Sequence, residues 1–251
     1  MRNPLDLSGK RVIVTGASSG IGRATAVVLG QLGAELVLVA RRQDALEETL
    51  GMLEGTGHVA ACYDLTEVDG IPAWLKGVAA ARGVPFDGVV HAAGLSTAIP
   101  IRILNRSRME DLMVLNVYAS LALVRGMAAK GVGADAASLV LVSSVSGLAG
   151  ALGHSVYSAS KGALHAMVRS AAKELAPRRM RINCVAPAWV QGPIMDVVQD
   201  IQGDGFAKVA ERQFLGAISP EDVATSAAYL LSDATRTISG TTLVIDGGWT
   251  C

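Results

Sequence analysis

RVIVTGASSGIG, residues 11–22, decides the fold class of this chain. Its first half is an apolar run typical of a buried strand, and a glycine-rich turn follows at once. The turn leads into an apolar helix expected near 20–32. Strand, glycine turn and helix in this order indicate a parallel α/β sheet whose first turn can seat a phosphate.

Three glycines in this turn, Gly16, Gly20 and Gly22, are spaced G-x3-G-x-G rather than G-x-G-x-x-G. Gly16 permits a tight turn, Gly20 lets the backbone approach a pyrophosphate, and Gly22 lets the helix pack closely on the strand. The helix N-terminus then presents free N–H groups and a positive dipole. We therefore expect a dinucleotide site here, to which Ser18, Ser19 and Ile21 also contribute.

Short apolar runs and longer helical patterns alternate along the rest of the chain. The expected strands are 11–16, 35–40, 58–63, 87–92, 138–143, 181–186 and 242–245, and the expected helices are 20–32, 44–54, 68–82, 105–130, 157–176 and 220–232. This alternation predicts a single-domain, Rossmann-type, doubly wound sheet of seven parallel strands over residues 1–251, with helices on both faces. The irregular segment near 188–218 is expected to cover the substrate.

Composition argues against several classes of partner. Lys plus Arg and Asp plus Glu both number 22, so no long-range field favours nucleic acid or an anionic membrane. No signal peptide is expected at the N-terminus, and no apolar run is expected to span a membrane. Three isolated cysteines, without metal-site spacing, are expected to be buried, inert thiols. We expect a cytoplasmic protein without a metal.

Two arginines, Arg41 and Arg42, end the second expected strand at the place where NAD-selective sites usually carry an acid. A carboxylate there would repel a 2′-phosphate, whereas a guanidinium can bind one through two hydrogen bonds. The pattern therefore predicts NADP(H) rather than NAD(H); a solvated basic turn is the alternative. Arg23, in the first turn of the next helix, is expected to assist.

Tyr157 and Lys161 are four residues apart, so a helix places them on one face. A free tyrosine has a pKa of about 10, too high for a base at neutral pH. We expect the Lys161 ammonium to lower the pKa of Tyr157 into the range where the phenol can pass a proton. Ser144 ends an expected strand and can donate to the substrate oxygen.

With these motifs in this order, the chain resembles the short-chain dehydrogenase/reductase family over nearly its whole length, from GKRVIVTGASSGIG to SGTTLVIDGGW. The resemblance implies a catalytic set of Asn116, Ser144, Tyr157 and Lys161, with Asn116 holding a relay water and Lys161 bonding the nicotinamide ribose. It also favours Asp64 as an acceptor for adenine over a turn-forming role. The remaining cofactor positions that it implies are Leu65, Ala92, Ala93, Gly94, Pro187, Ala188, Trp189 and Val190.

Three positions depart from the family's pattern. His91 stands where an Asn usually ties the central strands, and we expect a hydrogen-bonded core histidine rather than a catalytic acid. Ala188 replaces a glycine and adds a methyl group near the nicotinamide. Gly192 replaces a threonine, so that side-chain contact with the cofactor is lost. None of these changes removes the proton-transfer set.

Substrate contacts are expected from Ser144, Tyr157 and five further residues of this region, namely Ser146, Leu148, Leu152, His154 and Trp189. The chain looks most similar to 3-oxoacyl-[acyl-carrier-protein] reductases, which suggests a small-molecule ketone or secondary alcohol, with a 3-oxoacyl thioester as one candidate. The C-terminal stretch builds subunit interfaces in relatives, so a homotetramer is expected and a homodimer is the alternative.

Two other functions compete with a reductase. A non-catalytic NADP(H)-binding sensor or scaffold would be expected to have lost a catalytic residue, and all four are present. A sugar-nucleotide epimerase or dehydratase of the extended relatives would need a larger C-terminal substrate region than the one after the last expected strand.

Overall fold

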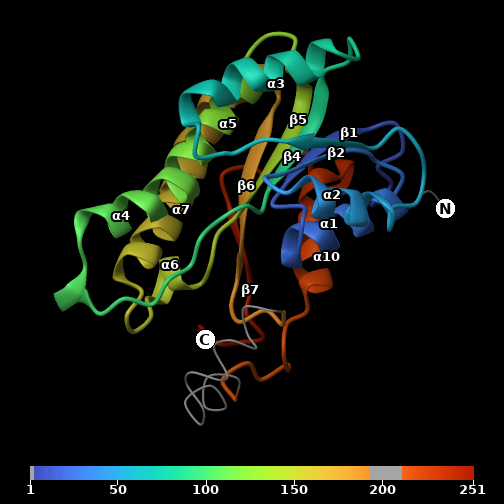
Figure 1. The fold of residues 1–251 in the computed structure, drawn as a ribbon. Coiled ribbons are helices and arrows are strands. Elements are labelled where there is room, and N and C mark those ends of the chain that lie inside the picture. The colour runs from blue at the N-terminus through green and yellow to red at the C-terminus, as the bar shows by residue number, and fades with distance from the viewer. Residues whose placement is uncertain (1–2, 193–210) are drawn as a thin grey trace.

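Seven parallel strands form one sheet in the computed structural model, which describes residues 3–192 and 211–251. Their spatial order is β3-β2-β1-β4-β5-β6-β7 (Figure 1). The strands are β1 Arg11–Thr15, β2 Glu35–Ala40, β3 Val59–Cys62, β4 Phe86–His91, β5 Gly133–Val142, β6 Arg181–Pro187 and β7 Thr242–Ile245. The predicted doubly wound sheet is confirmed, and its order reverses between β1 and β4, where ligands of such sheets bind.

Helices cover both faces of the sheet, as expected. In Figure 1, α1, α2 and α10 lie on one face and α3, α5 and α7 on the other. The helices are α1 Gly20–Gln31, α2 Gln43–Leu50, α3 Ile71–Ala80, α4 Arg106–Met113, α5 Ala119–Ala128, α6 Ser146–Ala149, α7 Ser155–Leu175 and α10 Pro220–Leu231. Single 3₁₀ turns occupy Val68–Gly70, Ile101–Ile103, Ala176–Arg178 and Asp233–Thr235.

Alternate residues of the central strands pack into two separate hydrophobic cores, one on each face of the sheet. On β1, Val12 and Val14 pack with α1, α2 and α10, whereas Ile13 packs with α3, α5 and α7. All five residues of β1 are buried, which explains why the strand reads as a continuous apolar run. The double burial fixes the register of the central strands, so their carboxyl ends meet at one edge of the sheet.

The helix expected over 105–130 is interrupted by a π-helical turn, Val114–Tyr118, that separates α4 from α5. Within the run Arg106–Ala128, an 18-residue window has a mean hydropathy of 1.3, so by length and composition the run could cross a membrane. Much of it belongs to the core: Leu123 and Met127 are fully buried against α3 and β5. It therefore packs as a core helix of the sheet.

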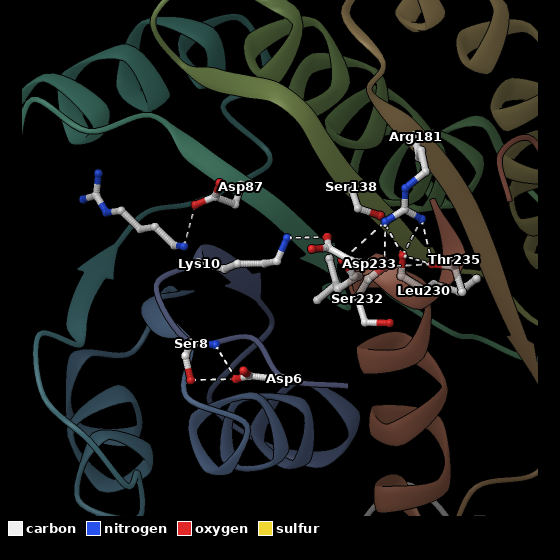
Figure 2. Close-up of polar contacts among 12 residues, drawn as sticks. Asp6, Ser8, Lys10, Asp87, Ser138, Arg181, Leu230, Ser232, Asp233 and Thr235 are labelled. Carbon is white, nitrogen blue, oxygen red and sulfur yellow. Dashed lines mark hydrogen bonds and ion pairs between the residues drawn. The ribbon is translucent and has the colours of Figure 1, made fainter. Parts of the chain in front are cut away.

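One buried arginine, Arg181 at the start of β6, joins that strand to the C-terminal end of α10. The Arg181 guanidinium donates to the backbone oxygens of Leu230 (2.7 Å), Leu231 (3.3 Å) and Ser232 (3.1 Å), and to Thr235 Oγ1 (2.9 Å) (Figure 2). It thereby satisfies carbonyls that a helix end leaves free. At the other end of α10, Ser219 is the N-cap and forms a capping box with Asp222.

The expected substrate segment near 188–218 lies partly outside the described residues, which omit 193–210. Its base is described: Val190 and Ile218 form a β-bridge, and the Gln191 N–H donates to the Ile218 carbonyl at 2.8 Å. The expectation for the cysteines was wrong for two of three, because Cys62 and Cys251 are exposed and only Cys184 is buried.

Candidate functional site

A cavity of about 610 Å³ opens at the carboxyl ends of the strands. Of the described residues predicted to bind the cofactor or the substrate, all line it except Arg23, Leu148 and Leu152. The predicted catalytic residues Ser144, Tyr157 and Lys161 lie at one end, and Arg41, Arg42 and the glycine turn line it too. Residues far apart in the sequence thus share one elongated pocket, as a dinucleotide and a substrate in contact would require.

The glycine turn has the geometry expected from its sequence. Gly16 (φ +68°) lies against the backbone of Ala93, because a Cβ on Gly16 would come within 2.8 Å of the Ala93 nitrogen. Gly20 (φ +50°) faces open space, with no described atom within 4 Å of where its Cβ would stand. Ser19, the N-cap of α1, makes no capping hydrogen bond with its side chain. Backbone N–H groups at the start of α1 are therefore accessible to an anion.

Gly22→Ala is expected to disturb this turn from within, since the added Cβ would overlap the carbonyl of Gly16. Overpacking of this kind costs about 1–3 kcal/mol. Urea unfolding should show that loss of stability, and NADPH affinity should fall with it. Gly77→Ala is the matched control on α3: its Cβ meets no described atom within 4 Å, so the variant should gain about 0.5–1 kcal/mol.

Arg41 and Arg42 are exposed side chains on the wall of the cavity, directly after β2. The expectation that Arg23 assists them was wrong. Arg23 instead donates to Thr49 Oγ1 (3.0 Å), to the Ser18 carbonyl (2.7 Å) and to Glu48 (3.0 Å), and it does not line the cavity. Its guanidinium therefore joins the glycine turn to α2 by hydrogen bonds.

Asp64 has the turn-forming role, and because it also lines the cavity the adenine role stays a prediction. Its Oδ1 accepts from the Thr66 N–H (2.9 Å) and the Thr66 hydroxyl (2.8 Å), so it forms the turn after β3. It also lines the cavity, as does Leu65. The Thr66 hydrogen bonds, together with the charge of Arg41, lower the pKa of Asp64. The carboxylate is therefore charged at neutral pH.

Tyr157 and Ser144 face each other across the catalytic end of the cavity. Ser144 Oγ accepts from the Ser146 N–H at 3.1 Å, which leaves its own proton free to donate. Burial raises the pKa of Tyr157, and hydrogen bonding with Ser144 and with Ser96 lowers it in part. Ser96 was not predicted.

Lys161 does not lower the pKa of Tyr157 in the expected way. Its Nζ lies 5.8 Å from the centroid of the Tyr157 ring and donates to the Val142 carbonyl at 2.8 Å. The ammonium thus faces a backbone dipole rather than the phenol oxygen. Burial lowers the pKa of Lys161 from 10.5 to about 8, so the ammonium loses its proton far more readily than a free lysine.

Asn116 lies in the π-helical turn, a feature often found at functional sites, but it does not line the cavity. Its Nδ2 donates to the Leu95 carbonyl (2.9 Å) and to Ser160 Oγ (3.0 Å), and its Oδ1 accepts from the Leu95 N–H (2.9 Å). Both protons of the amide are used within the protein. Only an Asn116 oxygen could hold the expected relay water.

His91 is the core histidine that was expected. It is 2% exposed at the end of β4, and its Nδ1 lies 2.7 Å from Thr15 Oγ1 at the end of β1. Thr15 Oγ1 also accepts from the Ala93 N–H at 3.2 Å, so this hydroxyl ties the ends of β1 and β4 together. Burial, aided by the charge of Lys161, lowers the pKa of His91 from 6.5 to about 3.

His91→Asn is expected to make the free energy of unfolding depend less on pH on the acid side of neutrality. Unfolded chains bind a proton at this histidine below pH 6.5, but the folded protein resists protonation down to about pH 3. Stability is therefore lost as the pH falls through this window, by up to about 1.4 kcal/mol per pH unit. Asparagine removes that contribution. Urea unfolding of both proteins at pH 7, 6, 5 and 4 measures it; parallel curves would contradict a neutral, buried His91.

The substrate half of the cavity has few charges. Ser146, His154 and Trp189 line it as predicted. Leu148, within α6, and Leu152, in the turn after α6, do not: they are 51% and 99% exposed. His154 Nδ1 donates to the Leu152 carbonyl at 2.9 Å, so the neutral ring presents Nε2 as an acceptor. Further lining residues were not predicted from the sequence, namely Val39, Tyr63, Thr66, Leu95, Ser96, Leu115, Val142, Ser143, Val145, Ala151 and Trp249.

Known proteins resemble this chain over nearly its full length. Residues 16–250 match a family model described as enoyl-(acyl carrier protein) reductase. Cis-4-hydroxycyclohexanecarboxylate dehydrogenase of Sinomonas cyclohexanicum is 34% identical, over 95% of each chain. L-xylulose reductase of Mus musculus is 30% identical, over 98% of each chain.

A solved structure agrees with the fold and with the type of site. It is described as a putative NAD(P) dependent gluconate 5-dehydrogenase from Beutenbergia cavernae with bound NADP at low occupancy. Its TM-score is 0.88 at 29% identity, and the match covers 98% of this chain and 99% of that one. Fold and sequence comparisons thus point to the same group of oxidoreductases.

Proposed function

The chain belongs to the short-chain dehydrogenase/reductase family, and from this we propose that it transfers a hydride between NADP(H) and a ketone or secondary alcohol. The observation that carries the proposal is one cavity that joins the glycine turn and Arg41–Arg42 to Ser144, Tyr157 and Lys161. A sensor or scaffold role has no comparable observation in its favour.

The cavity fits NADP(H) on three grounds. The start of α1 offers uncapped N–H groups to a pyrophosphate, and Gly20 leaves open space in front of them. Arg41 and Arg42 offer two guanidinium groups for a 2′-phosphate. Asp64 would accept from the adenine amino group, and Lys161 would hold the nicotinamide ribose. When bound, the cofactor supplies or accepts the hydride.

Proton transfer would be the task of Tyr157. In the reducing direction, its phenol gives a proton to the substrate oxygen while the adjacent carbon is reduced. Ser144, whose proton is free, would donate to the same oxygen as charge develops there. Lys161, with its pKa lowered to about 8, would return a proton toward the phenol between turnovers. Asn116 would act as a positioning residue and would hold the relay water by an oxygen.

An uncharged carbonyl compound suits the substrate half best. Besides Tyr157, the ionisable residues described at that end are His154 and Lys161, so no guanidinium is offered there to a carboxylate or phosphate. Nε2 of His154 would accept from a substrate hydroxyl, and Trp189 would supply an apolar wall. These features favour a neutral ketone group, for which a 3-oxoacyl thioester is our leading candidate.

We also propose that residues 1–251 form one domain, since all seven strands belong to one sheet. A cytoplasmic homotetramer, or a homodimer, is proposed from the family resemblance. Tyr118 and Leu121 of the α4–α5 run are each 48% exposed, which leaves apolar area for a subunit contact. Sedimentation of the purified protein would test the oligomeric state.

NADPH oxidation by the purified protein, against a panel of ketones, tests the function. The panel should contain a 3-oxoacyl thioester, a cyclic ketone, a ketose and a ketoacid. Turnover with any member supports the reductase, and we expect the neutral members to react faster than the ketoacid. Tight NADPH binding without turnover on any member, in either direction, would favour the sensor.

A further inference from the structure

The carboxyl end of β5 is tied to α7 through both the side chain and the backbone of Lys161. The Nζ of this lysine donates to the Val142 carbonyl at 2.8 Å, and its backbone carbonyl accepts from the Ser143 hydroxyl at 2.9 Å. The Ser143 N–H in turn donates to the Val185 carbonyl of β6 at 2.7 Å. Ser143 therefore links the sheet to the helix that carries Lys161, one position before Ser144.

His165, one helical turn after Lys161, is the second partner of the Ser143 hydroxyl. Its Nε2 lies 2.7 Å from Ser143 Oγ, and both side chains are buried. A hydroxyl has one proton and a carbonyl can only accept, so the imidazole donates from Nε2 when the hydroxyl donates to Lys161. The Ser143 oxygen is then held from two directions, which fixes the direction of its side chain.

A histidine is a costly residue at this place in the core. Its Nδ1 is buried without a hydrogen-bond partner among the described residues, and an unpaired buried polar atom destabilises the fold. Burial lowers the pKa of His165, and the charges of Arg169 and Lys161 lower it further, so the ring is neutral at pH 7. A leucine would fill a similar space without an unpaired nitrogen. What the histidine adds is therefore its hydrogen bond to Ser143.

We propose that Ser143 and His165 are positioning residues of this site and that they act as a pair. His165 fixes the Ser143 hydroxyl, and that hydroxyl fixes Lys161 against the strand end that leads to Ser144. The inference rests on the proposed function in that Ser144 and Lys161 must serve the reaction.

Close packing of the two backbones allows one hydroxyl to set this distance. A Cβ on Gly147, just after Ser144, would come within 2.6 Å of the Gly162 nitrogen, so α6 lies directly against α7 beside Lys161. With so little space between the segments, the loss of a bridging hydrogen bond changes how they pack. A misplacement of about 1 Å can lower a rate by about 100-fold, so we expect the pair to act on turnover rather than on cofactor affinity.

Ser143→Ala is expected to lower kcat for ketone reduction by about 10-fold and to leave the KM for NADPH nearly unchanged. Ser138→Ala is the matched control: Ser138 is a buried serine of the same strand, outside the cavity lining, and its hydroxyl donates to the Leu230 carbonyl at 2.8 Å (Figure 2). Urea unfolding should show similar losses of stability for both variants, but the control should keep its kcat. An equal fall of kcat in both variants, or a raised KM for NADPH with kcat unchanged, would overturn the proposal.

Replacement of the histidine separates its hydrogen bond from its packing. His165→Leu removes the donor and should lower kcat as Ser143→Ala does. His165→Gln, whose amide can donate from a similar position, should restore most of that kcat. The double variant with Ser143→Ala and His165→Leu should be no slower than the slower single variant, because both changes act on one hydroxyl. Losses that multiply, or a glutamine variant as slow as the leucine variant, would contradict the pair.

Nuclear magnetic resonance tests the pair without any substrate. An Nε2–H that donates to a buried oxygen exchanges slowly with water, so the isotope-labelled wild-type protein should show a protected imidazole proton that disappears in His165→Gln. Ser143→Ala should abolish the protection of this proton. A wild-type protein without the resonance would overturn the proposal, whatever its activity. If the resonance is present and no panel member reacts, the proposed function fails while the hydrogen-bonded pair stands.

Discussion

Tyr157→Phe is expected to lower turnover by about 10²–10⁴-fold while NADPH still binds. The variant keeps the aromatic ring, including its edge contact with His154, and loses only the phenol oxygen. That oxygen is where the proton of the proposed reaction resides, and Ser144 lines the same cavity. Steady-state NADPH oxidation measures the loss, and a fluorescence titration with NADPH confirms that the cavity is intact.

Tyr229→Phe is the matched control for this prediction, because Tyr229 is 40% exposed on α10 and lies outside the cavity. It should leave turnover unchanged. Retained turnover in Tyr157→Phe would mean that another group or a water delivers the proton, and the role proposed for Tyr157 would be lost.

Arg41→Ala combined with Arg42→Ala is expected to raise the KM for NADPH by roughly 10–100-fold and to leave the KM for NADH nearly unchanged. Hydrogen bonds to charged groups are worth about 1.5–3 kcal/mol, and the double variant removes such bonds to the 2′-phosphate alone. Asp64, the acid described in the cavity, would stay and oppose the phosphate. The preference between the two cofactors should therefore shrink or reverse.

Salt provides a second measurement of the same interaction. The wild-type KM for NADPH should rise with ionic strength, and the double variant should show a weaker dependence, because exposed charges are screened. Arg236→Ala, an exposed arginine outside the cavity, controls for the change in net charge. Equal use of NADH and NADPH by the wild-type protein would contradict the assignment of Arg41 and Arg42.

Local pattern was enough for most of the fold and for the cofactor half of the site. The apolar run of β1 and the glycine turn are properties of neighbouring residues, and both appear as expected. The break in the helix around Asn116 was not predicted, since a π-helical turn has the same composition as the α-helix around it. Ser96 was missed as a lining residue because a serine in a loop has no periodicity to reveal its place.

Two long side chains point in directions that differ from those expected from the sequence. Arg23 and Lys161 were both expected to act on a ligand or on the phenol. The structure turns Arg23 onto Glu48, Thr49 and a carbonyl, and it turns Lys161 onto the Val142 carbonyl. Long cationic side chains take whichever acceptor lies in reach, and that depends on elements brought together from distant parts of the chain.

Local pattern was sufficient to predict the seven-stranded parallel sheet, the glycine turn before α1, the arginine pair after β2 and the residue types of the proposed catalytic set. Each of these follows from spacing along one strand or one helix turn. The contact of Asn116 with Leu95, and the burial of His91 against Thr15, became visible only in the folded chain. Those contacts join residues 20 to 80 positions apart, and they form only when packing of the two cores sets the distances between strand ends.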